Sequence, residues 1–468
     1  MKARCEAPVW RGICVLAVIV VNTRASMAVE PNFKLLRYDE DYSYLARAHP
    51  DSDVFDPVKF VPLDAAADVW LSLGGEVRER YEYFNHTLWG QGPQDSDGYL
   101  LQRVFLHGDL HLGDPFRAFV QLKDSRAYGR AGGPRSIDED RIDLNQAFID
   151  WKWSLADNVS LTARAGRQEL AYGSSRLISP REGTNVHQSF DGLRGILSGS
   201  DYSVDAFATD RVENRADEWD DRSSSRGRLW GVYSAVPCRW LPGGHLDAYY
   251  LGVTRDAAQY DQGTAREKRH SIGMRIWGEQ SGWDYNLEFV YQFGEFGPDR
   301  IRAWMVASET GFTLHDAPLR PRLSLKLDAA SGDRDPGDSR LESFNALYPR
   351  SAYFNDSSLI GASNFVDIHP ALDVHPDRLT TVTLDCDLFW RESVHDGLYG
   401  LSLNLVRTGL TTNARFIGSQ PSIRVERGIG RHWNAAVIYA HFIAGAFLQR
   451  SGPGQDLDYV NTTLTLKF

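Results

Sequence analysis

Apolar and polar residues alternate one by one along much of this chain, from residue 69 to its last residue. In the stretch 457–468, every second residue from Val460 to Phe468 is apolar or Thr, while the residues between them, from Tyr459 to Lys467, are mainly polar. Successive side chains of a β-strand point to opposite faces, so this pattern predicts a strand with one apolar and one polar face. Such a strand suits either the wall of a membrane barrel or a half-buried strand of a soluble sandwich.

The residues on the polar face separate these two interpretations. Between Trp283 and Phe293, six apolar or aromatic residues alternate with a face that includes Asp284 and Glu288. The stretches 322–328 and 384–391 repeat the arrangement with Arg, Lys and Asp on the polar face. Charged faces that persist over roughly 400 residues, with no helical period to supply a second layer, favour a barrel whose polar face lines the interior.

Short turns alternate with long polar loops along the same region. Gly113–Pro115 and Leu155–Asn158 are short, whereas the longest loops are expected near residues 85–98, 128–140, 171–187, 211–227 and 331–363. Outer-membrane barrels show this asymmetry, with short periplasmic turns and long extracellular loops. We therefore predict an all-β fold, a transmembrane antiparallel β-barrel of about 18 strands, with about 16 as the alternative.

The first 66 residues do not follow the alternation. Lys2, Arg4 and Arg11 precede an apolar run, and small residues lead up to Ala28, which predicts a secretory signal peptide over residues 1–28. Residues 29–66 are mixed, acidic and interrupted by Pro, so we expect an N-terminal periplasmic or lumenal arm. The barrel is then expected over residues 67–468.

Composition narrows the classes of function. The chain has 62 acidic and 51 basic residues and a formal net charge of −11, which argues against a nucleic-acid partner. Its 41 Gly, 13 Trp, 20 Tyr and 22 Phe suit the tight turns and aromatic girdles of a membrane barrel. The sequence has no nucleophile elbow and no phosphate loop, so we expect neither an enzyme nor a bound cofactor.

Charged residues on the predicted inner faces are candidates for lining a pore, because a barrel of this size cannot fill itself with wall side chains. The basic candidates are Arg78, Arg80, Arg103, Arg117, Lys123, Arg164, Arg322, Lys326, Arg391 and Arg424. The acidic candidates are Glu76, Asp109, Asp150, Glu288, Asp328, Asp385, Asp387 and Glu426. Rings of Arg and Lys select anions; the alternative is that these charges pair across neighbouring strands and only hold the wall together.

One long loop contains a weak candidate for a calcium site. Asp333, Asp335 and Asp338 resemble a cation-binding loop that lacks its terminal Glu. The alternative is an ordinary acidic loop outside the membrane. No other metal site is assigned.

Eight short motifs, in order along the chain, resemble the alginate export family of outer-membrane porins. They are Leu73–Tyr81, Gln146–Trp151, Gly166–Leu170, Phe190–Gly195, Ala330–Pro336, Phe344–Pro349, Asp385–Arg391 and His441–Leu448. The resemblance implies an outer-membrane channel with an Arg-lined constriction that passes an anionic uronate polymer outward without energy input. It also implies that Arg167, from the Gly-Arg-Gln motif, is a pore residue.

The chain departs from the pattern of the alginate exporter within this family in two places. Asn145 and Gln146 stand where the exporter has an Arg-Glu pair, and Glu169 stands where it has a second Arg. Replacing Arg by Asn and Glu lowers the positive potential of the constriction. The resemblance therefore implies membership of the family, but it does not imply that alginate is the transported polymer.

These observations predict an outer-membrane porin that gives a polar, anionic carbohydrate passive passage. The alternatives are a substrate-specific uptake porin for small solutes, an outer-membrane barrel enzyme, or an adhesin. Expected partners are outer-membrane lipids and lipopolysaccharide, an anionic polysaccharide or small solute, and the barrel-assembly machinery through Phe468. We expect a monomer.

Overall fold

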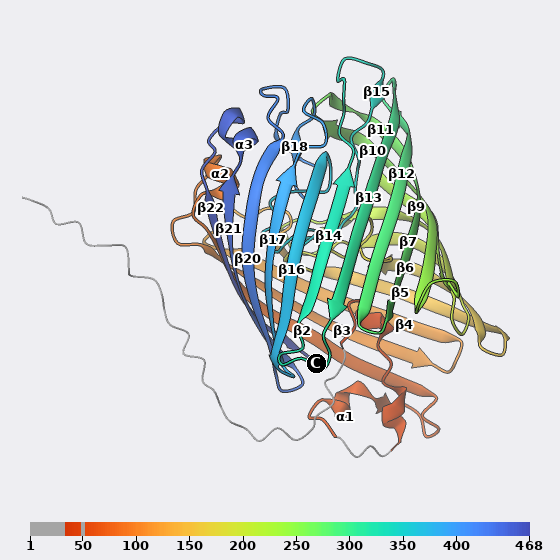
Figure 1. Ribbon diagram of the computed structural model, residues 1–468. Helices are drawn as coiled ribbons and strands as arrows, with labels where there is room; N and C mark the ends of the chain where they lie inside the picture. The colour runs from red at the N-terminus through yellow and green to blue at the C-terminus, as the bar shows by residue number, and fades with distance from the viewer. Residues whose placement is uncertain (1–32, 48–51) are drawn as a thin grey trace, which may run out of the picture.

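The computed structural model describes residues 33–47 and 52–468. Eighteen long strands form one closed antiparallel barrel, and Figure 1 shows how they are arranged in its wall. In chain order they are β2 (Val69–Phe84), β3 (Tyr99–Leu112), β4 (Phe116–Tyr128), β5 (Asp140–Ala156), β6 (Val159–Gln168), β7 (Phe190–Ser198), β8 (Ser203–Glu213), β9 (Arg222–Pro237), β10 (Gly244–Tyr260), β11 (Gly263–Gln280), β12 (Trp283–Phe296), β13 (Asp299–Thr313), β14 (Arg322–Ala330), β16 (Phe365–Asp377), β17 (Thr380–Trp390), β20 (Phe416–Ile429), β21 (Trp433–Ala444) and β22 (Leu457–Lys467). The predicted fold class is confirmed, with 18 strands rather than 16.

The barrel closes between its first and last strands. β2 pairs with β22 in antiparallel register, from Glu76 opposite Lys467 to Phe84 opposite Tyr459. The remaining elements are short. They are β1 (Val61–Pro62), β15 (Arg340–Leu341), β18 (Leu398–Tyr399), β19 (Leu405–Arg407), η1 (Arg37–Asp39), η2 (Ser43–Ala46), α1 (Asp56–Lys59), α2 (Thr87–Gly90) and α3 (Ala446–Ser451). Among the described residues, no helix combines the length and the apolar character needed to span a membrane.

Strand β12 shows how the alternation of residues builds the wall. Leu287, Phe289, Tyr291 and Phe293 lie on the outer face and are 36% to 48% exposed, whereas Glu288 on the inner face is 6% exposed. The outer face of a membrane barrel contacts lipid, where a charged side chain costs about 2–4 kcal/mol. The period of two thus sorts apolar residues outward and polar residues inward.

The connections differ in length between the two ends of the barrel. The end where the C-terminus and α1 lie (Figure 1), here called the short-turn end, has connections from two residues (281–282) to eight residues (314–321). The other, long-loop end has the long connections 85–98, 129–139, 169–189, 331–364, 391–415 and 445–456, together with 214–221 and the two-residue turns 261–262 and 297–298. The long connections 391–415 and 445–456 were not expected. The loop expected near 211–227 spans only 214–221, because β8 and β9 continue into that region.

Two of the long loops fold into the barrel because the strands that carry them are short. β6, β7 and β14 have nine or ten residues, while the nearby β5 and β13 have 17 and 15. The loops 169–189 and 331–364, here called the first and second inward loops, meet at a parallel bridge between Ile178 and Tyr348. The backbone N–H of Ser179 donates to the Tyr348 carbonyl at 2.9 Å, and that of Arg350 donates to the Ser175 carbonyl at 2.9 Å.

The inward loops bring an apolar core into the barrel. Leu177, Ile178, Phe344, Tyr348 and Phe354 are each at most 8% exposed and belong to one cluster of buried residues. The wall strands alone would leave a wide polar lumen. Packing of these loop residues narrows the lumen.

The described part of the arm, residues 33–47 and 52–66, contacts the interior at the short-turn end. Arg37 donates to the carbonyls of Gly75 at 3.1 Å and Phe468 at 2.8 Å. Tyr38 is 2% exposed, and the guanidinium of Arg164 lies 4.1 Å from the centre of its ring. The expected signal peptide, residues 1–28, lies outside the described residues, as do 29–32 and 48–51 of the arm.

Candidate functional site: the passage through the barrel

Three of the predicted pore arginines hold the first inward loop against the wall. Arg78 donates to the carbonyl of Glu182 at 3.0 Å and to that of Thr184 at 2.7 Å. Arg103 donates to the same two carbonyls at 3.0 Å each and pairs with Glu76. Arg80 donates to the carbonyl of Gly183. The turn 182–184 is therefore fixed on β2 and β3, and it narrows the lumen from that side.

Two cavities adjoin beside this turn. The cavity toward the short-turn end has a volume of about 660 Å³, and the cavity toward the long-loop end has about 350 Å³. Both are lined by Arg80, Gly183, Ser351 and Asp356. These four residues come from β2 and from both inward loops, so we take them as the narrow part of the candidate passage.

The short-turn cavity is basic although the whole chain is acidic. Its charged lining comprises the basic Arg78, Arg80, Arg350, Arg424, Arg431 and Lys467, and the acidic Glu182, Asp356 and Glu426. Arg424 pairs with Asp356 at 2.9 Å and with Glu426 at 2.9 Å. Six basic side chains against three acidic ones leave an excess of positive charge here.

Arg350 carries much of that excess. Among the described residues, its guanidinium donates a hydrogen bond to the carbonyl of Tyr353 at 3.4 Å, and its buried Nε has no hydrogen-bond partner. Burial, together with the neighbouring Arg176, lowers the pKa of Arg350. A desolvated guanidinium that faces a cavity without a carboxylate of its own favours a bound anion.

A further cavity at the long-loop end is lined by three arginines and no carboxylate. It has a volume of about 370 Å³ and includes Arg181, Arg211 and Arg255. Burial, followed by the charges of Arg211 and then Arg255, lowers the pKa of Arg181 to about 10. The buried Nε of Arg181 has no hydrogen-bond partner among the described residues.

The predicted pore residues divide into those that line the cavities and those held in ion pairs elsewhere in the interior. Arg78, Arg80, Arg424 and Glu426 line the short-turn cavity, and Arg322, Lys326 and Asp385 line a cavity beside it. Two pairs join neighbouring wall strands, Arg117 with Asp109 and Arg164 with Asp150, each at 2.7 Å. Two residues also pair with loops: Lys123 with Asp140 of β5 and Asp221 of the connection 214–221, at 2.6 Å each, and Glu288 with Arg176 of the first inward loop at 3.0 Å. Asp328 accepts the backbone N–H of Ser308 at 3.0 Å.

Arg391 and Arg167 are both held by neighbouring residues. Arg391 is 0% exposed, and its guanidinium donates to carbonyls of the loop 391–415, such as that of Gly409 at 3.2 Å. Arg167 pairs with Asp191 at 2.9 Å and donates to the carbonyl of Leu144 at 3.0 Å. The first organises a loop, and the second is neutralised by a neighbouring strand.

Glu169 and Asn145 lie together in the barrel interior. Asn145 Nδ2 donates to Glu169 Oε1 at 2.8 Å, and His187 Nδ1 lies 2.6 Å from the same oxygen. Gln146 accepts the backbone N–H of Glu169 at 3.0 Å. The two departures from the exporter pattern are thus in direct contact and form one polar cluster at the start of the first inward loop.

The candidate calcium loop has a different arrangement. Asp333, Asp335 and Asp338 each accept a backbone N–H from within their own loop, at 3.0, 3.1 and 2.7 Å. This is the geometry of carboxylates that stabilise turns. Calcium binding at this loop stays a prediction.

Sequence reasoning did not single out several lining residues. Arg181, Glu182, Arg350 and Asp356 lie in the inward loops, which have no periodic pattern that could place their side chains. Arg255 lies on β10 and shares the parity of the buried Val253, so the alternation could have found it.

Comparisons with known proteins agree with the barrel fold. The sequence profile of the Alginate export family matches residues 69–462. No curated protein matches the chain. Solved structures with a similar fold include three from Pseudomonas aeruginosa, and each aligns with 85% of this chain. OccK11 (OpdR) is 12% identical, with 96% of its length aligned and a TM-score of 0.53. OccD3 (OpdP) is 12% identical, with 91% of its length aligned and a TM-score of 0.57. OccK2 (OpdF), solved in complex with glucuronate, is 11% identical, with 98% of its length aligned and a TM-score of 0.56.

Proposed function

The chain belongs to the alginate export family and forms an outer-membrane channel rather than an enzyme, and from this premise we propose that it gives a polar, anionic carbohydrate passive passage. The observation that carries the proposal is the segregation of charge. The chain has a formal net charge of −11, yet basic side chains outnumber acidic ones by six to three in the short-turn cavity. Basic linings select anions.

The arginine positions extend this preference along the passage. Arg181 and Arg211 line the cavity at the long-loop end, and Arg80 and Arg350 line the cavities at and below the narrow part. An anion can pass from one guanidinium to the next. Its binding at each site is then strong enough for the anion to enter the channel and weak enough for it to leave. Neutral lining residues such as Ser351 would form hydrogen bonds with the sugar hydroxyls.

The inward loops favour the uptake of small solutes as a second candidate function. Their contact at Ile178 and Tyr348 crosses the lumen and leaves adjoining cavities of about 350 and 660 Å³. Cavities of this size suit a sugar acid or a single extended chain. One of the structures with a similar fold was solved in complex with glucuronate.

Single-channel recording in a planar bilayer tests the proposal. We expect an anion-selective reversal potential in a salt gradient, and block of the current by oligouronates at lower concentrations than by neutral oligosaccharides of equal length. Cation selectivity, or equal block by both sugars, would contradict it. Block by a monouronate as effective as by longer oligomers favours the uptake porin, and block that strengthens with length favours the polyuronate channel.

Assembly through Phe468 stays a separate prediction. Its backbone pairs with that of Gly75, at 3.0 and 2.9 Å, and its ring stacks on Phe55 at 4.9 Å. We propose that the barrel-assembly machinery recognises this residue before the ring is covered. Phe468→Ala should then lower the yield of assembled barrel in cells while refolding of the purified chain changes little.

A further inference from the structure

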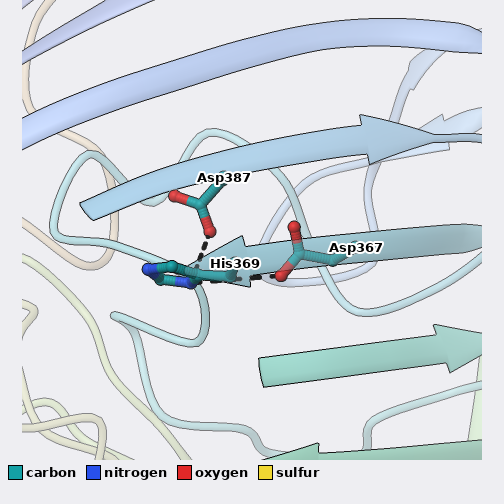
Figure 2. A group of neighbouring side chains, drawn as sticks. All are labelled: Asp367, His369 and Asp387. Atoms are coloured by element: carbon teal, nitrogen blue, oxygen red, sulfur yellow. Dashed lines mark ion pairs between the residues drawn. The ribbon is translucent and has the colours of Figure 1, made fainter. Parts of the chain in front are cut away.

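Two neighbouring strands of the wall bring two aspartates and a histidine together inside the barrel. Asp367 and His369 lie two residues apart on β16 and therefore share a face, and Asp387 lies on the adjacent β17. His369 Nδ1 is 2.8 Å from Asp387 Oδ1 and 4.0 Å from Asp367 Oδ2. Figure 2 shows both carboxylates directed at the same ring nitrogen.

The three side chains are buried and their polar atoms are not satisfied. Asp367 and His369 are each 2% exposed, and Asp387 is 0% exposed. Asp367 Oδ1, both ring nitrogens of His369, and Asp387 Oδ1 have no hydrogen-bond partner among the described residues. Buried polar atoms without a partner are rare in folded proteins, because each costs about 1–3 kcal/mol. His369 Nδ1 and Asp387 Oδ1 thus form an ion pair at 2.8 Å without the geometry of a hydrogen bond, and Asp367 Oδ2 lies 4.0 Å from the same nitrogen.

The surroundings add to the negative charge. Asp328 on β14 stands directly opposite Asp367, and like charges at such a pair destabilise a sheet. Asp385 Oδ1 is 3.8 Å from His369 Nε2. Lys326 stands opposite His369 on β14, and the charges of Arg176 and Arg350 act on Asp328. Among the described residues, Asp367 and Asp387 form ion pairs with His369 alone, so the cluster favours a further cation.

We propose that Asp367, His369 and Asp387 bind a divalent transition-metal ion of the Zn²⁺ class. One imidazole nitrogen and two carboxylate oxygens are ligands that this class of ion accepts, whereas Ca²⁺ and Mg²⁺ prefer oxygen alone. Ligands held about 2.1 Å from such an ion lie roughly 3–4 Å from one another. The separations of 2.8 and 4.0 Å from His369 Nδ1 are close to the two ends of that range. Asp385 Oδ1 lies on the far side of the ring, 3.8 Å from Nε2, which is too far for a direct hydrogen bond.

A second acidic cluster in the same barrel has its negative charge balanced by a lysine instead. Asp140, Asp143 and Asp221 also bring their carboxylates close together. There the ammonium of Lys123 lies 2.6 Å from both Asp140 and Asp221 and supplies the positive charge. The Asp140 cluster is therefore neutralised by a lysine of the chain, whereas the Asp367 cluster is proposed to take its cation from outside.

The proposed site is reachable from the lumen. His369 and Asp385 line a cavity of about 240 Å³ that adjoins the short-turn cavity, since both cavities include Arg350 and Arg424. Asn355 of the second inward loop donates to Asp387 Oδ2 at 2.8 Å and covers the cluster from inside. This leaves Asp387 Oδ1 directed at the proposed ion.

Titration of the folded, EDTA-treated full chain in detergent with Co²⁺ and then Zn²⁺ tests the proposal. We expect one Co²⁺ per chain, visible d–d absorption bands, and displacement of Co²⁺ by equimolar Zn²⁺. Ca²⁺ and Mg²⁺ at a hundredfold excess should not displace it. His369→Asn and Asp367→Asn should each weaken binding by more than tenfold.

Control variants separate loss of the site from loss of folding. His441→Asn, which alters a half-exposed His paired with Asp458 at 2.8 Å, should bind Co²⁺ as the native chain does. Asp387→Asn keeps the shape of the side chain and should also weaken binding, with heat-modifiable migration on gels reporting an intact barrel. Absence of the Co²⁺ bands in the native chain, equal binding by Asp367→Asn, or displacement by Ca²⁺ would each overturn the proposal.

Discussion

The hydroxyl of Tyr38 donates a 2.9 Å hydrogen bond to the backbone carbonyl of Glu169. A residue of the N-terminal arm thereby contacts the first residue of the first inward loop. The ring of Tyr38 also packs edge-on against Phe119 and Phe148, at 6.1 and 5.3 Å between centres. The arm is therefore placed to stabilise the loop that narrows the passage.

Tyr38→Ala should release the arm. Removing a buried aromatic side chain costs on the order of 3 kcal/mol, while the pairing between β2 and β22 is untouched. We expect faster cleavage of the arm by trypsin and larger current fluctuations, with the barrel itself still resistant. Tyr44→Ala is the matched control, because Tyr44 is 52% exposed. Equal protection of the arm in both variants would contradict this role for Tyr38.

Anchoring of the first inward loop should depend on pH through His187. Burial lowers the pKa of His187 and Arg103 acts in the same direction, but the carboxylates of Glu169 and Glu182 outweigh both, so the pKa is raised above 6.5. A raised pKa contributes stability that is complete below pH 6.5 and is lost as pH rises through the higher folded-state value.

The corresponding measurement compares single-channel currents at pH 6 and pH 9. Each unit by which the pKa is raised contributes about 1.4 kcal/mol. The loop should therefore be looser, and the current noisier, at the higher pH. His187→Gln cannot take up the proton and should show a smaller difference between the two pH values. The same difference in both proteins would rule out His187 as its source.

Arg350 and Arg167 should differ in their effect on selectivity. Arg350→Gln removes a charge that faces the short-turn cavity, and we expect the anion-to-cation permeability ratio to fall roughly twofold to fivefold. Arg167→Gln should change the ratio less, because Asp191 already neutralises Arg167 at 2.9 Å. Arg126→Gln is the control, since Arg126 is exposed and pairs with Asp124 at 3.0 Å. A larger effect at Arg167 would reverse this assignment of the lining.

Asp356→Asn should act in the opposite direction. Asp356 lines the narrow part, and its ion pair with Arg424 at 2.9 Å ties the second inward loop to β20. The pair is partly exposed, so its loss should cost less than about 1 kcal/mol and leave the fold intact. Reversal potentials should then show higher anion selectivity, because the lining loses one negative charge and Arg424 keeps only its ion pair with Glu426. A fall in selectivity would show that Asp356 does not face the permeating ion.

The sequence by itself determined the barrel. A strand has a period of two whatever surrounds it, so the alternation between Trp283 and Phe293 already assigned the lipid face, and the turn lengths assigned the two ends. The motifs along the chain resembled the family that the sequence profile then matched over residues 69–462. These features are local, and local patterns survive small errors in strand ends.

Only the tertiary structure decided which charges line the passage. Arg103 and Arg424 both appear on polar faces, yet one holds a loop and the other lines a cavity. The difference depends on where the loops 169–189 and 331–364 fold, and loops have no period that fixes their side chains. Asp367 and Asp387 are 20 positions apart in the sequence, and only strand pairing makes them neighbours of one histidine.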